Sequence, residues 1–595
     1  MRCPHSDRCP GCALLELPYP AQLETKGRLL ADALSGYAPL RELAVGAALP
    51  AEPSTGYRVR AKLVAAGGSL GLFGRGGHEV VDIPECLVMT PRVREAAAQV
   101  RALLPELSQV SSVDVRETDA GMLVTLALPP GASEAERKRV TERVVAGVTG
   151  VVTVALSSRE RAAPQLLGAD LRVVHGPAEV KHTLEAGTPY HYAAPGAFTQ
   201  THPGQARWLH QSVERELTTL ADESRRETGH GESGPLAGLE VLELYAGSGA
   251  LAQRLLARGA RVTHVESFQP AVELAERAAR EQGLSLLALA TDATSALKTL
   301  ARDGASFDAV LVNPPRRGLD PDVRRLVAAL APRLLVYVSC DPLTLARDAD
   351  HFARLGFLLA RATPFDMIPL SDSVETLAVF QQRDPPLPPV LHAMPRFLAV
   401  EKAPHEPTLP QSEHRGSLLE RVRRLPGAAE AVAATRLELG TSGICLFARK
   451  AADLDALTRA LERAEVRYVA LVRGSTHPRG SLRPSAPKGV TPADVARTRY
   501  ERRALAGGHS LLHVFPAPQQ TPKIKLQLTG IGHPVLGDAR NGDARSNLHF
   551  QHRHGLDRTF LHAAELSFEL DGQPLTLRSE LPADLERVLA SLKGP

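Results

Sequence analysis

Short apolar runs alternate with amphipathic patterns in the middle of the chain. Between positions 239 and 380, apolar runs are separated by segments in which apolar residues recur every three or four positions. The runs are LEVLELY, RVTHVE, FDAVLVN and LLVYVSC. This alternation is typical of a parallel sheet that is covered by helices on both faces. The pattern predicts an α/β Rossmann-like domain in this part of the chain.

The segment before this region has a different pattern. Residues 14–198 combine short alternating runs, such as 57–65, with helical ones, such as 93–104. This mixture predicts an α+β region. The polar stretch 222–238 predicts an exposed loop between the two regions.

The length of the chain indicates several domains, because 595 residues exceed what one hydrophobic core supports. Prolines crowd the stretch 383–394, where they block both a helix and a central strand and predict a linker. We expect a multidomain protein with an α+β domain, the α/β domain and a second α+β domain, at 1–197, 198–382 and 395–595.

Composition and charge narrow the class of protein. Hydrophobic residues make up 44% and charged residues 23%, which is ordinary for a globular protein. No apolar run approaches the roughly 18 residues of a membrane span, and the first residues do not resemble a signal peptide. We therefore expect a cytoplasmic protein without a membrane partner. The net charge of +4 is compatible with a polyanionic partner but does not demonstrate one.

The first apolar run of the α/β region leads into a glycine-containing turn, ELYAGSGA, in which Gly247 and Gly249 allow close approach to a ligand. Glu266 ends the next run, where a carboxylate can accept hydrogen bonds from ribose hydroxyls. The turn lacks the third glycine of dinucleotide sites and the lysine of triphosphate sites, which points to S-adenosylmethionine. Asn313 begins a second irregular turn, NPPRRG, expected at the same edge of the sheet. From the glycines alone, a turn that binds nothing remains the alternative.

Cys340 follows the apolar run LLVYVS and precedes a predicted helix. The dipole at a helix start lowers the pKa of a thiol, so we expect a reactive thiolate; a buried structural cysteine is the alternative. Carbon C5 of uracil is a poor nucleophile, and a methyltransferase must first add a thiolate to C6. The C5 proton must then be removed, and Glu375, at the start of the next apolar run, is the candidate base.

Five motifs in order resemble the RNA uracil-C5 methyltransferase family: FTQTH, ELYAGSGA, NPPRRG, VYVSCDPLTLARD and FDMIPLSDSVE. The resemblance covers the first two-thirds of the chain. It is most specific to the branch that acts on 23S ribosomal RNA and lacks an N-terminal TRAM domain. It implies Cys340 as the nucleophile and Glu375 as the proton acceptor. It also implies a set of residues that bind the methyl donor: Gln200, Tyr245, Gly247, Gly249, Glu266, Asp292 and Asn313.

Three of the six cysteines, Cys3, Cys9 and Cys12, lie within the first twelve residues, and Cys86 follows in DIPEC. Four thiolates can hold a structural zinc ion or a [4Fe-4S] cluster, and ligand chemistry alone does not separate the two. Disulfides are disfavoured in a reducing cytoplasm. The resemblance implies the iron–sulfur cluster, with a structural or RNA-positioning role.

The last 200 residues resemble the RluA-like pseudouridine synthases through RFLAVEK, TRLELGTSG, RYVALVRG and GHPVLGD. In that family an aspartate and a later arginine are essential; here Glu438 and Lys525 stand in their places, and Tyr468 is retained. We expect a degenerate RNA-binding module, and an active synthase in a bifunctional enzyme remains the alternative. The basic stretch 477–488 is a further candidate RNA contact.

RNA is the expected partner, ribosomal RNA rather than transfer RNA, and no obligate protein partner is inferred. Two other functions remain open at this stage. The Asn-Pro-Pro motif also occurs in exocyclic-amine methyltransferases, although an aromatic residue normally follows it and here Arg316 follows. A non-catalytic RNA-binding scaffold is the second alternative.

Overall fold

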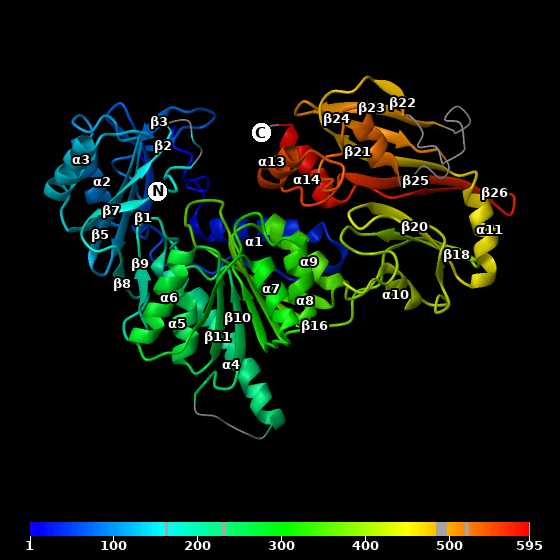
Figure 1. Ribbon diagram of the computed structural model, residues 1–595, viewed down its shortest axis with the longest axis horizontal. Coiled ribbons are helices and arrows are strands. Elements are labelled where there is room, and N and C mark those ends of the chain that lie inside the picture. The colour runs from blue at the N-terminus through cyan, green and yellow to red at the C-terminus, as the bar shows by residue number, and fades with distance from the viewer. Residues whose placement is uncertain (161–162, 164, 229–233, 483–496, 518–522, 594–595) are drawn as a thin grey trace.

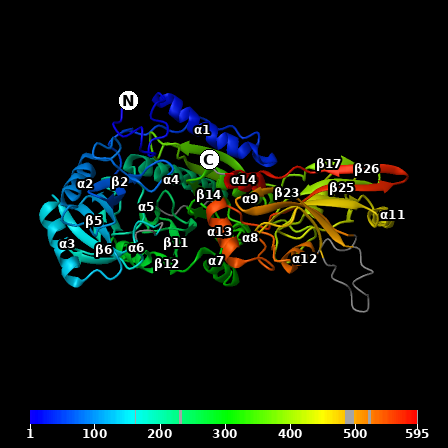
Figure 2. The same cartoon turned by 90° about the horizontal axis from the view of Figure 1, so that it is seen from above.

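The structure is a computed structural model that describes residues 1–160, 163, 165–228, 234–482, 497–517 and 523–593. It contains two seven-stranded sheets and one ten-stranded sheet, together with a small two-stranded one. Figure 1 shows three lobes, and the middle domain, drawn in green, lies between the N-terminal and C-terminal domains. The view from above in Figure 2 gives the same order. No helix of the described residues is long and apolar enough to cross a membrane.

The middle domain confirms the predicted alternation of strands and helices. Its sheet has the order β12-β11-β10-β13-β14-β16-β15. The strands are β10 (Glu240–Leu244), β11 (Arg261–Glu266), β12 (Leu287–Ala290), β13 (Ala309–Val312), β14 (Leu334–Ser339), β15 (Phe357–Phe365) and β16 (Glu375–Gln382). The helices between them are α5 (Ala250–Ala257), α6 (Gln269–Glu281), α7 (Ala293–Arg302), α8 (Pro321–Ala329) and α9 (Pro342–Arg354).

The sheet is not wholly parallel. Strands β10 to β14 are parallel to one another, whereas β16 runs antiparallel to both β14 and β15. An apolar run carries no information on strand direction, so the sequence did not predict this reversal. As a result, the start of β16 lies beside the end of β14.

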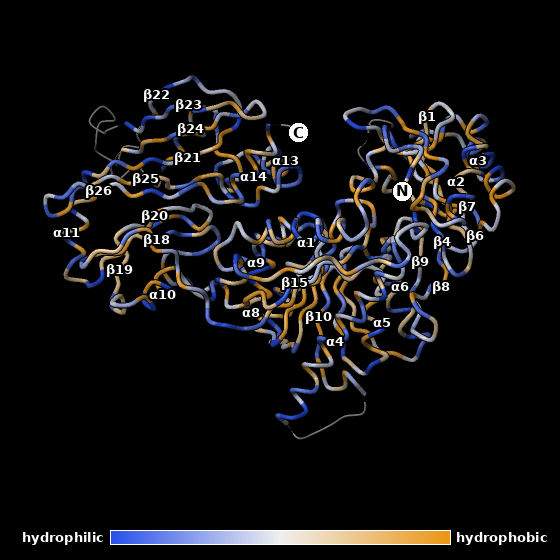
Figure 3. The backbone as a smooth tube through the Cα atoms, turned by 180° about the vertical axis from the view of Figure 1, so that it is seen from behind, coloured by the Kyte–Doolittle hydropathy of each residue, from blue (hydrophilic) through white to orange (hydrophobic). Residues whose placement is uncertain are grey.

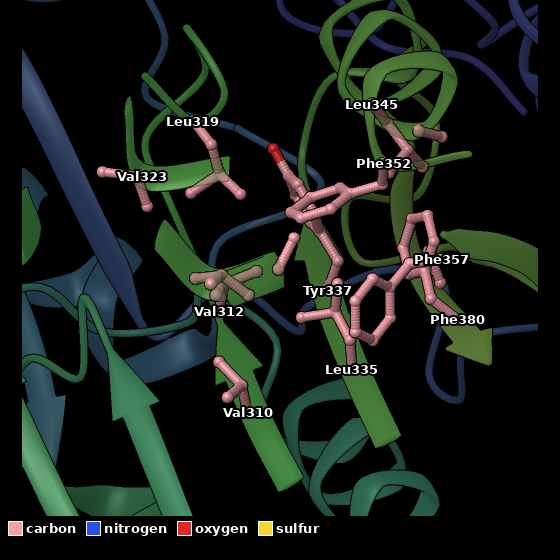
Figure 4. Packing of buried hydrophobic residues seen from close by; sticks show 14 of the residues in the cluster. Val310, Val312, Leu319, Val323, Leu335, Tyr337, Leu345, Phe352, Phe357 and Phe380 are labelled. Carbon is pink, nitrogen blue, oxygen red and sulfur yellow. The ribbon is translucent and has the colours of Figure 1, made fainter. Parts of the chain in front are cut away.

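Helix α1 (Tyr19–Ser35) belongs to the core of the middle domain, although residues 1–197 were expected in the first domain. Leu30 and Leu34 join the buried cluster on one face of the middle sheet. Figure 4 shows part of this cluster, with Tyr337 close to Phe352. The buried side chains of Lys26 and Asp366 form an ion pair that joins the helix to the domain. The amphipathic pattern of a helix does not say which sheet it covers, and this explains the difference.

Helix α4 (Pro203–Thr228) covers the opposite face of the sheet through residues such as Leu209, Val213 and Leu217. It extends into the polar stretch 222–238, whose first seven residues were expected to form a loop. Residues 229–233 lie outside the described residues. Figure 3 shows apolar residues along the central strands near β10 and more hydrophilic ones at the far end of α4.

The N-terminal domain has the predicted α+β composition, with the sheet order β3-β2-β1-β4-β5-β6-β7. Its strands are β1 (Arg60–Ala66), β2 (Ser69–Phe73), β3 (Val80–Asp82), β4 (Ser112–Thr118), β5 (Gly121–Leu128), β6 (Val151–Ser158) and β7 (Arg172–His175). Helices α2 (Pro91–Leu103) and α3 (Glu134–Gly147) pack on this sheet, and β8 (Val180–His182) pairs with β9 (His191–Ala193).

The C-terminal domain is built on the sheet order β17-β18-β20-β25-β21-β24-β23-β22. Its elements include β17 (Val390–Ala393), β18 (Phe397–Lys402), β20 (Ser442–Ala448), β21 (Glu465–Val472), β22 (Arg479–Leu482), β23 (Thr498–Ala506), β24 (His509–Phe515), β25 (Leu561–Leu570) and β26 (Gln573–Arg578). The helices are α10 (Leu418–Arg423), α11 (Ala451–Leu461), α12 (Ile524–Gly530), α13 (Ala544–His554) and α14 (Ala583–Leu592).

The structure differs from two predictions for the C-terminal part of the chain, the linker and the candidate RNA-binding stretch. Strand β17 occupies the end of the expected linker 383–394, because an edge strand tolerates the prolines that precede it. The candidate RNA-binding stretch 477–488 contains β22 up to Leu482, and the rest of that stretch lies outside the described residues.

Candidate active site

A pocket opens at the carboxyl ends of the parallel strands in the middle domain. Four of the predicted donor-binding residues line it: Gln200, Tyr245, Gly247 and Asn313. They come from the segment before α4, from the turn after β10 and from the turn after β13. Ligands of open α/β sheets bind at this edge, so the position matches that expected for the methyl donor.

The turn after β10 has an unusual backbone. Gly247 and Gly249 adopt φ angles of 58° and 77°, and a Cβ atom on Gly249 would lie 2.9 Å from that of Ala275. Tyr245 also has a positive φ of 59°, which is strained for a residue with a bulky side chain. Burial raises the pKa of the Tyr245 phenol to about 12, so the hydroxyl stays protonated. The turn thus places the ring of Tyr245 and the backbone of Gly247 in the lining of the pocket.

Two predicted donor-binding carboxylates have structural partners. Glu266 accepts hydrogen bonds from the backbone N–H of Gly247 at 3.1 Å and of Phe268 at 2.9 Å, which fastens the glycine turn to β11. Asp292 caps α7 by accepting from the backbone N–H and the hydroxyl of Ser295, and these bonds lower its pKa. Glu266 therefore supports the pocket through Gly247, which lines it, whereas Asp292 has a capping role.

Cys340 and Glu375 are neighbours across two strands. In the antiparallel pair of β14 and β16, Ser339 faces Thr376, so the next position outward brings Cys340 opposite Glu375. Val338, which lies on β14 two residues before the cysteine, lines the donor pocket. The pair therefore lies at the edge of the sheet next to that pocket.

The pKa of Cys340 differs from the sequence-based expectation. Burial, and after it the nearby Glu375, raise it to about 11 against the opposing effect of Arg316. The start of α9 was expected to lower this pKa, but burial and the neighbouring carboxyl raise it instead. Burial also raises the pKa of Glu375 to about 7, against which Arg316 again acts. The pair therefore favours a neutral thiol and a half-ionised carboxyl near neutral pH.

Arg316 is a site residue that sequence reasoning did not assign. It lies in the NPPRRG turn, three residues after Asn313, and its charge favours the ionised form of both Cys340 and Glu375. Its carbonyl accepts a hydrogen bond from the Thr344 hydroxyl at 3.1 Å, which ties the turn to α9. The arginine at this place in the motif was the signal that could have identified it.

Comparison with known proteins now identifies the family. A family model described as tRNA (Uracil-5-)-methyltransferase matches residues 236–383. A 23S rRNA (uracil(1939)-C(5))-methyltransferase of Pseudomonas aeruginosa is 31% identical over 388 residues, which are 64% of this chain and 80% of that protein. The chain belongs to the RNA uracil-C5 methyltransferase family. An RNA methyltransferase of Geobacter sulfurreducens is 28% identical over 69% of this chain and 81% of its own.

Among solved structures, the tRNA (uracil-54, C5)-methyltransferase of Pyrococcus abyssi in complex with S-adenosyl-L-homocysteine matches with 23% identity and a TM-score of 0.49. The match covers 62% of this chain and 86% of that one. Human RNA pseudouridylate synthase domain containing 4 matches 34% of this chain and 93% of its own, with 18% identity and a TM-score of 0.29.

The chain is thus an RNA (uracil-5-)-methyltransferase that uses S-adenosylmethionine. Membership of this family argues against both alternative functions, an exocyclic-amine methyltransferase and a non-catalytic RNA-binding scaffold. The standard donor of the family agrees with the glycine turn, which has no features for holding a pyrophosphate.

In the methyltransferase, the four predicted metal ligands line a second pocket, in the N-terminal domain: Cys3, Cys9, Cys12 and Cys86. Burial and then the other three thiols raise the pKa of Cys12 to about 11, which indicates that the four lie close together. Among the residues that the structure describes, no group of three or more His, Cys, Asp or Glu side chains is arranged to hold a metal ion.

The C-terminal domain brings together the predicted members of a second site. The ammonium group of Lys525 forms an ion pair with Glu438 and lies 3.2 Å from a carboxylate oxygen of Asp538. Tyr468 is buried, and burial raises its pKa, as do Cys445 and Glu438. Asp538, at the end of the GHPVLGD motif, was not predicted as a member of this site. The lysine is thus shared between two carboxylates.

The raised pKa of Glu375 has a consequence for stability. Folding raises this pKa from 4.5 to about 7, which means that the folded protein favours the protonated form of Glu375. The contribution to stability is complete below pH 4.5 and is lost as the pH rises through 7. Glu375→Gln removes this loss. We expect the variant to be more stable than the wild type at pH 8, by at most about 3 kcal/mol, and to lose most of this advantage near pH 5.

Denaturant unfolding of both proteins at the two pH values measures this difference. Glu273→Gln, at an exposed position on α6, is the control and should show no such pH dependence. An equal stability difference at pH 5 and pH 8 for Glu375→Gln would contradict the assignment.

Proposed function

We propose that this chain methylates C5 of a uridine in ribosomal RNA through a covalent adduct between Cys340 and C6 of the base. The observation that carries the proposal is the position of Cys340 opposite Glu375 and beside the donor pocket. Nucleophile, base and methyl donor are then all within reach of one pyrimidine ring, as catalysis by proximity requires.

The proposed reaction has three steps. The thiolate of Cys340 adds to C6, and the electron pair of the C5–C6 double bond moves into an enolate. C5 then forms a bond to the methyl group, whose bond to the donor sulfur breaks. The carboxylate of Glu375 takes the proton from C5, the C5–C6 double bond returns, and the C6–S bond breaks. The bound donor supplies the electrophilic methyl group.

Arg316 provides the charge that the first step needs. In the resting site, burial and Glu375 keep Cys340 protonated, and Arg316 is the cation that opposes them. We propose that the thiol of Cys340 passes its proton to the Glu375 carboxylate as the uracil ring enters, and that Arg316 stabilises the resulting thiolate once the opposing negative charge is gone. The carboxyl must then ionise before it can accept the C5 proton, and a pKa near 7 suits both states.

We propose large-subunit ribosomal RNA as the substrate, because relatives such as the Pseudomonas aeruginosa protein are named for position 1939 of 23S rRNA. The resemblance of the motifs favours the same branch.

The proposed reaction is tested by trapping. RNA that contains 5-fluorouridine carries a fluorine in place of the C5 proton, so the adduct cannot be resolved. Incubation with wild-type protein and S-adenosylmethionine should give a stable protein–RNA adduct on denaturing gels. Cys340→Ala should give neither adduct nor 5-methyluridine, while Cys445→Ala, which removes a buried cysteine of the C-terminal domain, should behave as the wild type. Methylation of uridine C5 by Cys340→Ala would refute the mechanism.

We further propose that the four N-terminal cysteines hold a [4Fe-4S] cluster. Four thiol donors in one pocket fit a cubane, which takes one thiolate for each iron, provided that their sulfur atoms converge when iron binds. Methyl transfer itself moves no electrons, so we assign the cluster a structural role. Its ligands would anchor the first strands of the N-terminal domain to the chain terminus.

Protein purified without oxygen should be brown and contain about four iron atoms per chain, as expected for a cubane with four cysteine ligands. Cys86→Ser should lose most of this iron, whereas Cys445→Ser should keep it. Stoichiometric zinc in place of iron in the anaerobic protein would disprove the assignment.

We propose that the C-terminal domain binds RNA and does not form pseudouridine. Lys525 pairs with Glu438 and also contacts Asp538, so the acid that would act on the base is held by a cation and is one methylene longer than the aspartate of the resembled family. Small displacements of a reacting group are costly. The alternative of a bifunctional enzyme rests on the same pair, because Glu438 remains half exposed and lies near Tyr468.

Pseudouridine mapping distinguishes the two. RNA treated with wild-type protein should contain 5-methyluridine without new pseudouridine, and Glu438→Gln should leave the methylation unchanged. Pseudouridine that is made by the wild type and lost in Glu438→Gln would show a working second active site.

A further inference from the structure

A buried carboxylate of the C-terminal domain reaches into the methyltransferase domain. Asp557, between α13 and β25, places one carboxylate oxygen 2.7 Å from Arg324 on α8 and 3.3 Å from Arg347 on α9. The side chain of Asp557 is 7% exposed, and those of the two arginines are 0% and 7% exposed. The contact therefore joins two domains through charges that water does not screen.

The same arginines are held by Asp348 of α9. Its carboxylate lies 2.7 Å from Arg324 and 2.8 Å from Arg347, and the side chain is fully buried. The second carboxylate oxygen accepts from the hydroxyl of Tyr337 at 2.9 Å and from the backbone N–H of Leu319 at 2.7 Å. Asp348 thus connects the ion cluster to the end of the NPPRRG turn.

The charges in this cluster balance only when Asp557 is present. Two arginines face two aspartates, and the nearby histidines, His351 and His405, are neutral because burial lowers the pKa of each. Without Asp557, two buried guanidinium groups would share one carboxylate. A buried cation that loses its partner is strongly unfavourable, so the side chains around it must move.

These side chains are also the support of the catalytic turn. Arg347 donates to the carbonyl of Arg317 at 2.9 Å, and Gly318 leaves no free space, since a Cβ atom there would lie 2.6 Å from Asp348. Arg316, next along the turn, is the cation that acts on Cys340. A displacement of Arg347 or Asp348 is thereby passed to the group that favours the thiolate.

We infer that Asp557 is a positioning residue for methyl transfer, through which the C-terminal domain fixes the NPPRRG turn and Arg316 beside Cys340. This inference rests on the proposed role of Cys340. It makes the C-terminal domain a part of the methyltransferase site, in addition to its proposed role in binding RNA.

The test uses the full-length chain with Asp557→Asn, which keeps the shape of the side chain and removes its charge. At saturating RNA and donor, we expect kcat for 5-methyluridine formation to fall by roughly 10- to 100-fold, because a displacement of about 1 Å can cost on the order of 100-fold. The KM for RNA should stay within about twofold of the wild-type value, as Asp557 is buried. The pH at which Cys340 is half alkylated by iodoacetamide should rise.

Two further variants separate positioning from general stability. Glu406→Gln removes the partner of Arg421 from an equally buried ion pair inside the C-terminal domain, and it should leave kcat unchanged. Arg324→Met combined with Asp557→Asn restores the balance of one arginine to one aspartate, and it should recover most of the lost kcat even if Asp557→Asn folds poorly.

The inference is overturned if folded Asp557→Asn turns over like the wild type, if Glu406→Gln loses as much activity, or if the double variant stays as slow as Asp557→Asn. A failure of the proposed function itself would give a different result: the wild-type protein would still methylate RNA after Cys340 has been alkylated.

Discussion

The antiparallel pairing of β16 with β14 is the constraint on which the site depends. Because β16 begins where β14 ends, the residue that starts one strand lies opposite the residue that follows the other, and these are Glu375 and Cys340. The donor pocket opens at the same edge, since the parallel strands β10 and β13 also end there. A single reversal of strand direction thus brings the nucleophile, the base and the methyl donor together.

Burial of this pair has an electrostatic cost that the surrounding charges moderate. Desolvation raises the pKa of both Cys340 and Glu375, and Arg316 is the cation that favours their ionised forms. Arg316 belongs to an irregular turn with no secondary structure of its own. Its position depends on α9 beneath it, and α9 is in turn held by a network of buried charges that extends to Asp557 in the C-terminal domain.

Much of this arrangement could be predicted from the sequence. Apolar periodicity located the strands of the middle sheet, and Cys340 was expected at its carboxyl edge because it follows an apolar run and precedes a helix. The direction of β16 could not be predicted, since an apolar run is the same in either direction. The pKa of Cys340 was predicted with the wrong sign, because the helix dipole can be inferred from the sequence whereas the depth of burial cannot. The partnership of Asp557 with Arg347 joins positions 210 residues apart, and local patterns carry no information on such contacts.

The central claim is that Cys340 attacks the base covalently and that Glu375 then removes the C5 proton. The most direct test is to react the Glu375→Gln variant with unmodified RNA and S-adenosylmethionine and to measure the intact mass of the product. Without the base, addition and methyl transfer should proceed but release should stall. We expect a protein–RNA adduct that is attached at Cys340 and is heavier by one methyl group, and that is absent when Cys340→Ala is added. Release of 5-methyluridine by Glu375→Gln at the wild-type rate, with no adduct, would contradict it.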